Sequence, residues 1–92
     1  MFFQSEAEAL KKSSWPKCDQ MAQALAVQGP RAADALEFAC TSRTHHVRSA
    51  SLKALSEVAP DRAKALAEKM IMDKAYEVRE TAANTLRVPI PD

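Results

Sequence analysis

The sequence predicts an all-α fold built from about three helical hairpins. Alanine is abundant, whereas the 92 residues include one glycine and only 5% aromatic residues. This composition favours helices, because alanine loses no side-chain entropy in a helix. No segment alternates β-branched or aromatic residues with polar ones, as half-buried strands do. The apolar residues instead recur at intervals of three and four, and the same helical pattern returns one hairpin later in the chain.

Six helices are expected within a single domain that spans residues 1–92. They pair into hairpins at residues 4–28, 31–59 and 61–87, each consisting of a helix, a tight polar turn and a second helix. The predicted helices cover residues 4–12, 15–28, 31–42, 44–59, 61–73 and 75–87.

The predicted helix ends rest on local signals. Ser5 and Glu8 form a predicted capping box, in which the Glu8 carboxylate reaches back to the Ser5 amide. Ser14 precedes the second helix, with a proline two residues later inside the first turn. Gly29 and Pro30 end that helix, because glycine readily adopts the left-handed conformation and proline cannot continue a helix.

The repeat becomes visible when the chain is shifted against itself so that the start of the second hairpin falls on the start of the third. The apolar faces of both helices then coincide in the two hairpins, and several residues are identical or similar. The matched pairs are Arg31 with Arg62, Ala32 with Ala63, Glu37 with Glu68, Val47 with Val78, Arg48 with Arg79, and Leu55 with Leu86.

The apolar faces predict one continuous core. Beyond this core, we expect an apolar flank around Ala83 and Leu86 on the C-terminal hairpin, partly covered by Val88 and Ile90. Such a flank predicts self-association through this hairpin, or a longer array of which the chain is a part. The large side chains expected in the core are Leu36, Leu55, Leu66, Met70, Ile71 and Leu86.

Segments 46–55 and 77–86 resemble the second helix of HEAT repeats, most closely the short bacterial type also found in phycobilisome-lyase-like proteins. Each segment carries the family's Val-Arg pair near the start of the helix, and Asp73 stands six residues before Arg79, as in the family. Ser42 takes the place of this aspartate in the earlier copy. The resemblance covers the second and third hairpins, and it implies a right-handed α-solenoid that serves as a scaffold.

Charge and cysteine content limit the classes of partner. The formal net charge is +1, from 13 basic and 12 acidic residues that are interspersed along the chain. This balance argues against a nucleic-acid or acidic-membrane surface, which needs concentrated basic residues. No apolar run is long enough to cross a membrane. The two cysteines form no CxxC pair. We therefore expect a cytoplasmic protein with free thiols whose partner is another protein.

No residue pattern predicts an enzyme, and we expect no catalytic residue, cofactor or metal ion. His45 and His46 are adjacent, and neighbouring side chains on a helix point about 100° apart, so convergence on one metal is not expected. Cys18 and Cys40 lie on apolar helix faces, where cysteine acts as a small hydrophobic residue. Nucleophile–base pairs and glycine-rich phosphate loops are absent.

The aromatic residues Phe2, Phe3 and Trp15 gather near the N-terminal hairpin. They could form a hot spot for a partner, because tryptophan is enriched in such positions. The favoured interpretation is that they cover the open end of the first hairpin, since the terminal unit of a repeat array has an apolar flank.

The outward side of the second helices is the predicted partner surface, and its charges are mixed. Binding of nucleic acid is the alternative, through Lys53, Arg87, Arg48 and Arg79. A further alternative, an accessory subunit of a lyase-type enzyme, rests on the family resemblance alone. The predicted surface comprises Ser49, Lys53, Ser56, Glu57, Glu80, Asn84 and Arg87.

Arg48, Arg79 and Asp73 have a predicted structural role that competes with nucleic-acid binding. Each arginine follows a valine at the start of a second helix, beside the turn that joins the two helices of its hairpin. A guanidinium group can bind a carboxylate and nearby turn carbonyls together. We therefore expect Asp73 to bind Arg48, Arg79 or both, in a ladder that sets the spacing between units.

Overall fold

The computed structural model describes residues 1–92 and contains six α-helices and no strand, which confirms the all-α prediction. Every predicted helix is present, although a 3₁₀ turn, η1 (Gly29–Ala32), replaces the expected start of the third. No helix combines the length and apolar character that a bilayer crossing requires. The helices are α1 (Gln4–Lys11), α2 (Lys17–Ala26), α3 (Ala33–Ala39), α4 (His45–Val58), α5 (Pro60–Met70) and α6 (Tyr76–Leu86).

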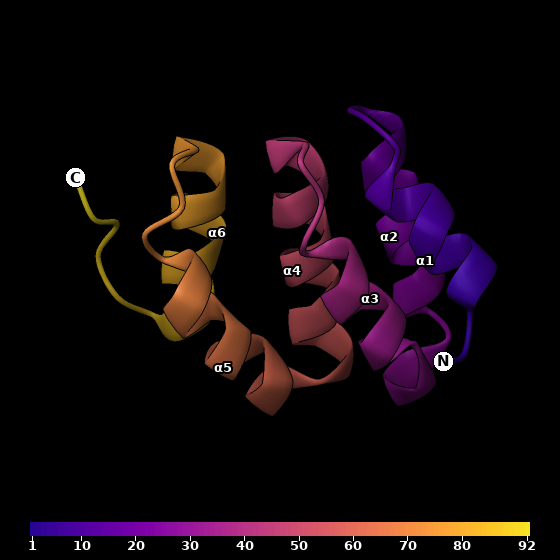
Figure 1. Ribbon diagram of the computed structural model, residues 1–92. Helices are drawn as coiled ribbons and strands as arrows, with labels where there is room; N and C mark the ends of the chain where they lie inside the picture. Colours follow the sequence, from indigo (N-terminus) through magenta and orange to yellow (C-terminus); the bar gives the residue numbers. More distant parts are fainter.

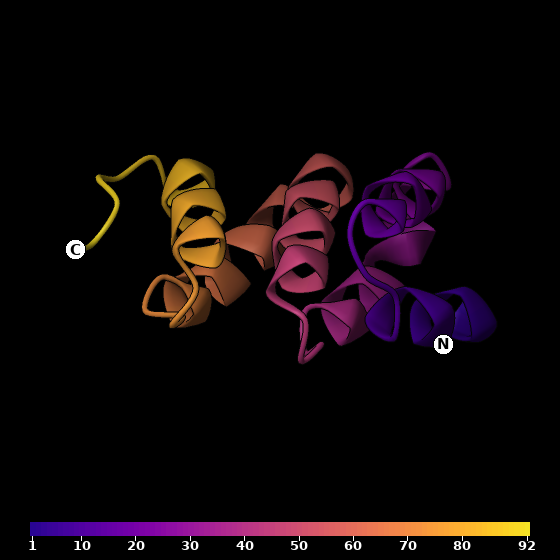
Figure 2. The same cartoon turned by 90° about the horizontal axis from the view of Figure 1, so that it is seen from above.

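The helices form two layers. Helices α2, α4 and α6 lie side by side in one layer, and α1, α3 and α5 occupy the other (Figures 1 and 2). Helix α4 is central, because it contacts α2 and α6 within its own layer and α3 and α5 in the other. The tail after α6 leaves the helices at the opposite end of the molecule from α1 (Figure 1).

The core lies between the layers and is built from leucine, valine and many alanines. Leu36 and Leu55 are fully buried and Met70 nearly so, as predicted. Leu66, Ile71 and Leu86 are only partly buried, packing against the edge of the core. The prediction of full burial was wrong for these three, because α5 and α6 end the layers and no further hairpin covers them.

Two predictions about the ends of the chain were wrong. Ser5 lies inside α1 and makes no capping box, because the helix already begins at Gln4, after Phe3 in the left-handed conformation (φ 63°). At the other end, the flank was expected around Ala83 and Leu86, but Ala83 is fully buried and only Leu86 remains partly exposed. Val88, which was expected to cover the flank, is itself 46% exposed.

Helix α6 ends in a Schellman motif with arginine in the position that glycine usually takes. The Val88 amide donates to the Ala83 carbonyl oxygen (3.0 Å), and the Arg87 amide donates to that of Asn84 (3.3 Å). Arg87 adopts the left-handed conformation (φ 59°) that this motif requires. The helix thus ends before Pro89, and the carbonyl groups of Ala83 and Asn84 are paired.

The turns between paired helices repeat the same hydrogen bonds at equivalent positions of the second and third hairpins. The Thr44 amide donates to Ser42 Oγ (3.1 Å), and the Ala75 amide donates to Asp73 Oδ1 (2.9 Å). Ser42 Oγ also donates to the Lys11 carbonyl oxygen in the preceding turn (2.6 Å). Serine and aspartate therefore both close the turn just before the helix that follows, and Ser42 connects its turn to the preceding hairpin.

Arg48 extends these links to the third hairpin. Its Nε and Nη2 donate to Asp73 Oδ2 (2.8 Å) and Oδ1 (2.9 Å), and its Nη1 donates to the Ser42 carbonyl oxygen (2.9 Å). Arg79 Nη1 donates to the carbonyl oxygens of Asp73 (2.9 Å) and Lys74 (3.1 Å). Asp73 therefore pairs with Arg48, one of the two partners expected, while Arg79 binds only the backbone of its own turn.

The electrostatics of Asp73 follow from this pairing. Its side chain is 14% exposed and that of Arg48 is 12% exposed. Burial favours the neutral carboxyl group, but the hydrogen bonds from Arg48 and the Ala75 amide outweigh it and hold the pKa of Asp73 below its ordinary value. The carboxylate is therefore charged throughout the neutral range.

The other layer is linked through arginines that also occupy equivalent positions of the repeat. Arg62 at the start of α5 forms ion pairs with Asp34 and Glu37 on α3. The Arg31 guanidinium lies 5.4 Å from the centre of the Phe2 ring and 5.6 Å from that of Phe3. In each case an arginine near the start of one hairpin contacts residues that come before that hairpin in the chain.

Replacing Leu55 with alanine tests the core. The side chain is fully buried, so its truncation should lower the free energy of unfolding by about 2–5 kcal/mol in a urea titration. Ser51→Ala is the matched variant, because the Ser51 hydroxyl is buried without a hydrogen-bond partner. Its removal should be neutral or stabilising. Losses of equal size in the two variants would contradict this description of the core.

Replacing Asp73 with asparagine tests the link between hairpins. Asparagine can still accept the Ala75 amide but lacks the charge that pairs with Arg48, so the variant should lose about 1.5–3 kcal/mol of stability at neutral pH. Because the native pKa is lowered, the stability from this charge is fully present above the ordinary carboxyl pKa of about 4. It is lost as the pH falls through the native pKa.

The difference between the wild type and Asp73→Asn should therefore shrink below about pH 4. Urea titrations at several pH values measure it. Asp34→Asn is the control, because the 62% exposed Asp34 should contribute only about 0.2–1 kcal/mol. A loss in Asp73→Asn that is constant with pH, or no greater than that of the control, would contradict the role assigned to the ion pair.

Candidate functional site

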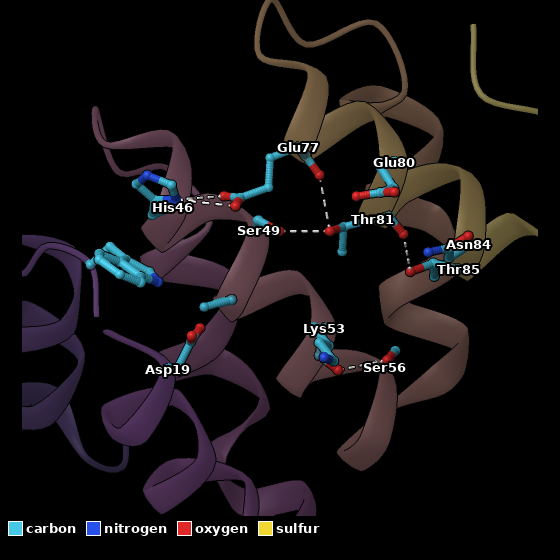
Figure 3. Close-up of a pocket in the computed structure, with 12 residues that line it drawn as sticks. Asp19, His46, Ser49, Lys53, Ser56, Glu77, Glu80, Thr81, Asn84 and Thr85 are labelled. Carbon is cyan, nitrogen blue, oxygen red and sulfur yellow. Dashed lines mark hydrogen bonds and ion pairs between the residues drawn. The ribbon is translucent and has the colours of Figure 1, made fainter. Parts of the chain in front are cut away.

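A polar hollow crosses the layer formed by α2, α4 and α6. It has a volume of about 420 Å³, and its walls come from these three helices and the residue Trp15 before α2 (Figure 3). Because the side chains belong to neighbouring helices of one layer, the hollow depends on the spacing between the hairpins.

The floor of the hollow is fixed by hydrogen bonds between α4 and α6. Ser49 Oγ lies 2.6 Å from Thr81 Oγ1, and Thr81 Oγ1 donates to the Glu77 carbonyl oxygen (3.0 Å) (Figure 3). Since the single Thr81 hydroxyl proton is used there, Ser49 donates to Thr81. Ser49 was predicted to be an exposed contact residue, but it is buried and joins the two helices.

One rim carries a row of three side chains from successive hairpins. The Trp15 and His46 ring centres lie 6.1 Å apart, and His46 Nδ1 lies 2.9 Å from Glu77 Oε1 and 3.1 Å from Oε2. The three residues are evenly spaced along the chain, so the row consists of equivalent positions of the repeat. Trp15 is 62% exposed, and the prediction that it covers the first hairpin was wrong.

His45 lies beside this rim, although it does not line the hollow. Its ring centre lies 4.1 Å from that of His46, and its Nδ1 lies 3.7 Å from Glu77 Oε1. The expectation that the two rings diverge was wrong. His45 is the first residue of α4, where no preceding turn restricts its rotamer, so both rings can turn toward Glu77.

The charged groups around the hollow are mainly acidic. Asp19, Glu77 and Glu80 line the hollow together with a single ammonium group, that of Lys53, which leaves a formal charge of −2 when His46 is neutral (Figure 3). Asp19, Glu80 and Lys53 are exposed. This local excess is not visible in the balanced charge of the whole chain.

Most of the predicted partner surface lies at the hollow. Glu57 lies outside it and accepts a hydrogen bond from Gln23 Nε2 (3.3 Å), and Arg87 lies beyond the end of α6. The predicted residues that line the hollow are Ser49, Lys53, Ser56, Glu80 and Asn84. The lining residues that sequence reasoning missed are Trp15, Asp19, His46, Ala50, Glu77, Thr81 and Thr85.

A signal for part of the missed set was present in the sequence. The shift that aligns the second hairpin with the third matches His46 with Glu77. The same shift also aligns the first hairpin with the second, and it then matches Trp15 with His46. It also places Asp19 opposite Ala50. The first hairpin matches the repeat weakly in its other residues, which is why α2 was not expected to contribute.

The aromatic residues before α2 divide into two groups. Phe3 packs against the core, while Phe2 is 64% exposed. The expected cover of the first hairpin is therefore limited to Phe3.

The thiol groups of Cys18 and Cys40 are not suited to act as nucleophiles. Cys18 and Cys40 are buried and free. Burial, with a smaller contribution from Glu37, raises the pKa of Cys40 to about 12, and burial and the neighbouring Asp19 raise the pKa of Cys18. Since the thiolate is the nucleophile, both groups are unreactive in the folded chain.

No protein-family model matches the chain, and the searches of curated proteins and solved structures found no similar protein.

Thiol labelling tests the burial of both cysteines. In the native protein at neutral pH, a disulfide reagent such as dithiobis-nitrobenzoate should react many times more slowly than with free cysteine, because neither group is exposed or ionised. Both thiols should react quickly in urea. Leu55→Ala should accelerate native labelling, since reaction then proceeds through opening of the core. Rapid native labelling of either cysteine would contradict the structure.

Proposed function

We propose that this chain is a non-catalytic protein-binding scaffold of HEAT-like repeats, arranged as a short right-handed α-solenoid. Its hollow across α2, α4 and α6 would hold a basic segment of another protein. The charge of the hollow supports this partner most strongly, because three carboxylates and only one ammonium group line it.

The repeated contacts support the solenoid part of the proposal. The bond from the Thr44 amide to Ser42 recurs between Ala75 and Asp73, and that from Arg48 to the Ser42 carbonyl recurs between Arg79 and Asp73. Recurrence of both packing layers and turn bonds is typical of repeat proteins, in which each unit contacts its neighbours. The short bacterial HEAT repeats resembled by the sequence have the same two-helix unit.

The chemistry of the hollow suits lysine or arginine side chains on a short segment. Asp19 and Glu80 are exposed on opposite sides of α4, so two cations of one segment can reach them. The hydroxyl and amide groups between them can bind a peptide backbone, and Trp15 offers an exposed ring for a cation. Electrostatic complementarity of this kind supplies specificity and a fast association rate.

Nucleic-acid binding is the less favoured candidate. Of the four basic residues that could serve it, Arg48 is occupied by Asp73, and Arg79 binds carbonyl oxygens of its own turn. The carboxylates of the hollow would repel phosphate groups. The third candidate, an accessory subunit of a lyase-type enzyme, has only the family resemblance in its favour.

A synthetic lysine-rich peptide tests the proposal. It should bind the protein more tightly than a glutamate-rich peptide of equal length in a fluorescence titration, and binding should weaken as salt is added. Asp19→Asn and Glu80→Gln should each weaken it roughly two- to fivefold, the equivalent of one exposed ion pair.

The matched control is Glu68→Gln on α5, an exposed glutamate outside the hollow, which should leave the affinity unchanged. Equal weakening by Glu68→Gln would show that the peptide binds nonspecifically. A gel shift with duplex DNA at low salt should show no complex, and DNA binding without peptide binding would favour the nucleic-acid alternative.

A further inference from the structure

Three potential metal ligands converge where the first turns of α4 and α6 lie beside each other. His45 and His46 come from α4, and Glu77 comes from α6. One ligand atom from each residue lies within 4.8 Å of the other two. The Glu77 carboxylate points toward His46 across the gap between the helices (Figure 3). We infer that these three side chains form a binding site for a transition-metal ion of the Zn²⁺ type.

The distances fit a tetrahedral ion with little rearrangement. Zinc binds imidazole nitrogen and carboxylate oxygen at about 2.0–2.2 Å, so two ligand atoms of a tetrahedral site lie about 3.4 Å apart. The Nδ1 atoms of His46 and His45 lie 2.9 and 3.7 Å from Glu77 Oε1, on either side of this value. Placing an ion between the three groups therefore requires only small side-chain movements, since the three ligand atoms already lie within 4.8 Å of one another.

The donor set selects the class of ion. Two imidazole nitrogens and one carboxylate oxygen suit Zn²⁺, Ni²⁺ or Cu²⁺, whereas Ca²⁺ and Mg²⁺ require mainly oxygen ligands. Three protein ligands leave a fourth position of a tetrahedral ion for water or a group of a bound molecule. This position faces solvent, because the side chains of His45, His46 and Glu77 are 48%, 36% and 40% exposed.

The surrounding charges permit a cation at this position. Arg43 and Lys74 are the nearest free cations, and both side chains are exposed to solvent that screens them. The charge of Arg48 is neutralised by Asp73. On the other side, the carboxylates of Asp19 and Glu80 border the hollow that His46 and Glu77 line.

The two helices that carry the ligands are already held at a fixed spacing. The Arg48–Asp73 ion pair lies on one side of the cluster, and the Ser49–Thr81 hydrogen bond joins the same two helices one turn further along. An ion bound by all three ligands would add a third link between α4 and α6. Its binding should therefore stabilise the fold as well as occupy the rim of the hollow. This inference does not depend on the proposed peptide partner.

Calorimetric titration of tag-free protein with zinc chloride at neutral pH tests the site. The chain contains two histidines, both in this cluster, and its two cysteines are buried, so no second strong zinc site is expected. One ion should bind per chain and raise the melting temperature. His45→Ala, His46→Ala and Glu77→Gln should each weaken binding at least tenfold and remove the thermal shift. Glu68→Gln, which alters an exposed carboxylate on α5 outside both the cluster and the hollow, should change neither.

A second readout separates loss of the site from loss of the fold. The single tryptophan, Trp15, lies beside His46, so Cu²⁺ should quench its fluorescence, and excess Zn²⁺ should reverse the quenching. Circular dichroism of each variant establishes that the helices are retained, and the exposed His45 is the substitution least able to disturb them. Absence of zinc binding by the wild type would overturn the inference. Binding that survives in folded His45→Ala and Glu77→Gln would also overturn it.

Discussion

The ion pair between Arg48 and Asp73 is the interaction on which the arrangement of the hairpins depends. It connects α4 of the second hairpin to the turn of the third, while the same guanidinium group binds the Ser42 carbonyl in its own turn. The apolar contacts between these helices are non-directional. A bidentate ion pair has a defined direction and distance, and it therefore fixes a spacing that apolar packing leaves loosely determined.

The hollow and the histidine cluster follow from this spacing. Once α4 and α6 are held in register, residues of neighbouring hairpins lie beside each other. The row of Trp15, His46 and Glu77 and the hydrogen bond between Ser49 and Thr81 can then form. The repeat thus has two roles, one at the turns that connect paired helices and one on the outer surface of α2, α4 and α6. On the side of the connecting turns, equivalent residues bind one another and hold the units together. On the outer surface of α2, α4 and α6, the equivalent residues differ, and this difference produces the acidic hollow.

Features that depend on periodicity could be predicted from the sequence. Features that depend on the rotamer of a single side chain could not. The six helices, the burial of Leu36 and Leu55, and the pairing of Asp73 with Arg48 all follow from spacing along the chain. The proximity of His45 to His46 does not, because it depends on freedom at the first residue of a helix. The exposure predicted for Ser49 was wrong because a short hydroxyl side chain can hydrogen-bond either to water or to a neighbouring helix. In this fold it bonds to Thr81 on α6.

A double-mutant cycle on Arg48 and Asp73 tests the central claim most directly. The free energy of unfolding is measured by urea titration for the wild type, Arg48→Gln, Asp73→Asn and the double variant. If the pair fixes the spacing of the hairpins, the two substitutions should be strongly non-additive, with a coupling energy of about 1–3 kcal/mol. Additive losses would show that each residue acts through other contacts, and that apolar packing alone sets the arrangement of α4 and α6.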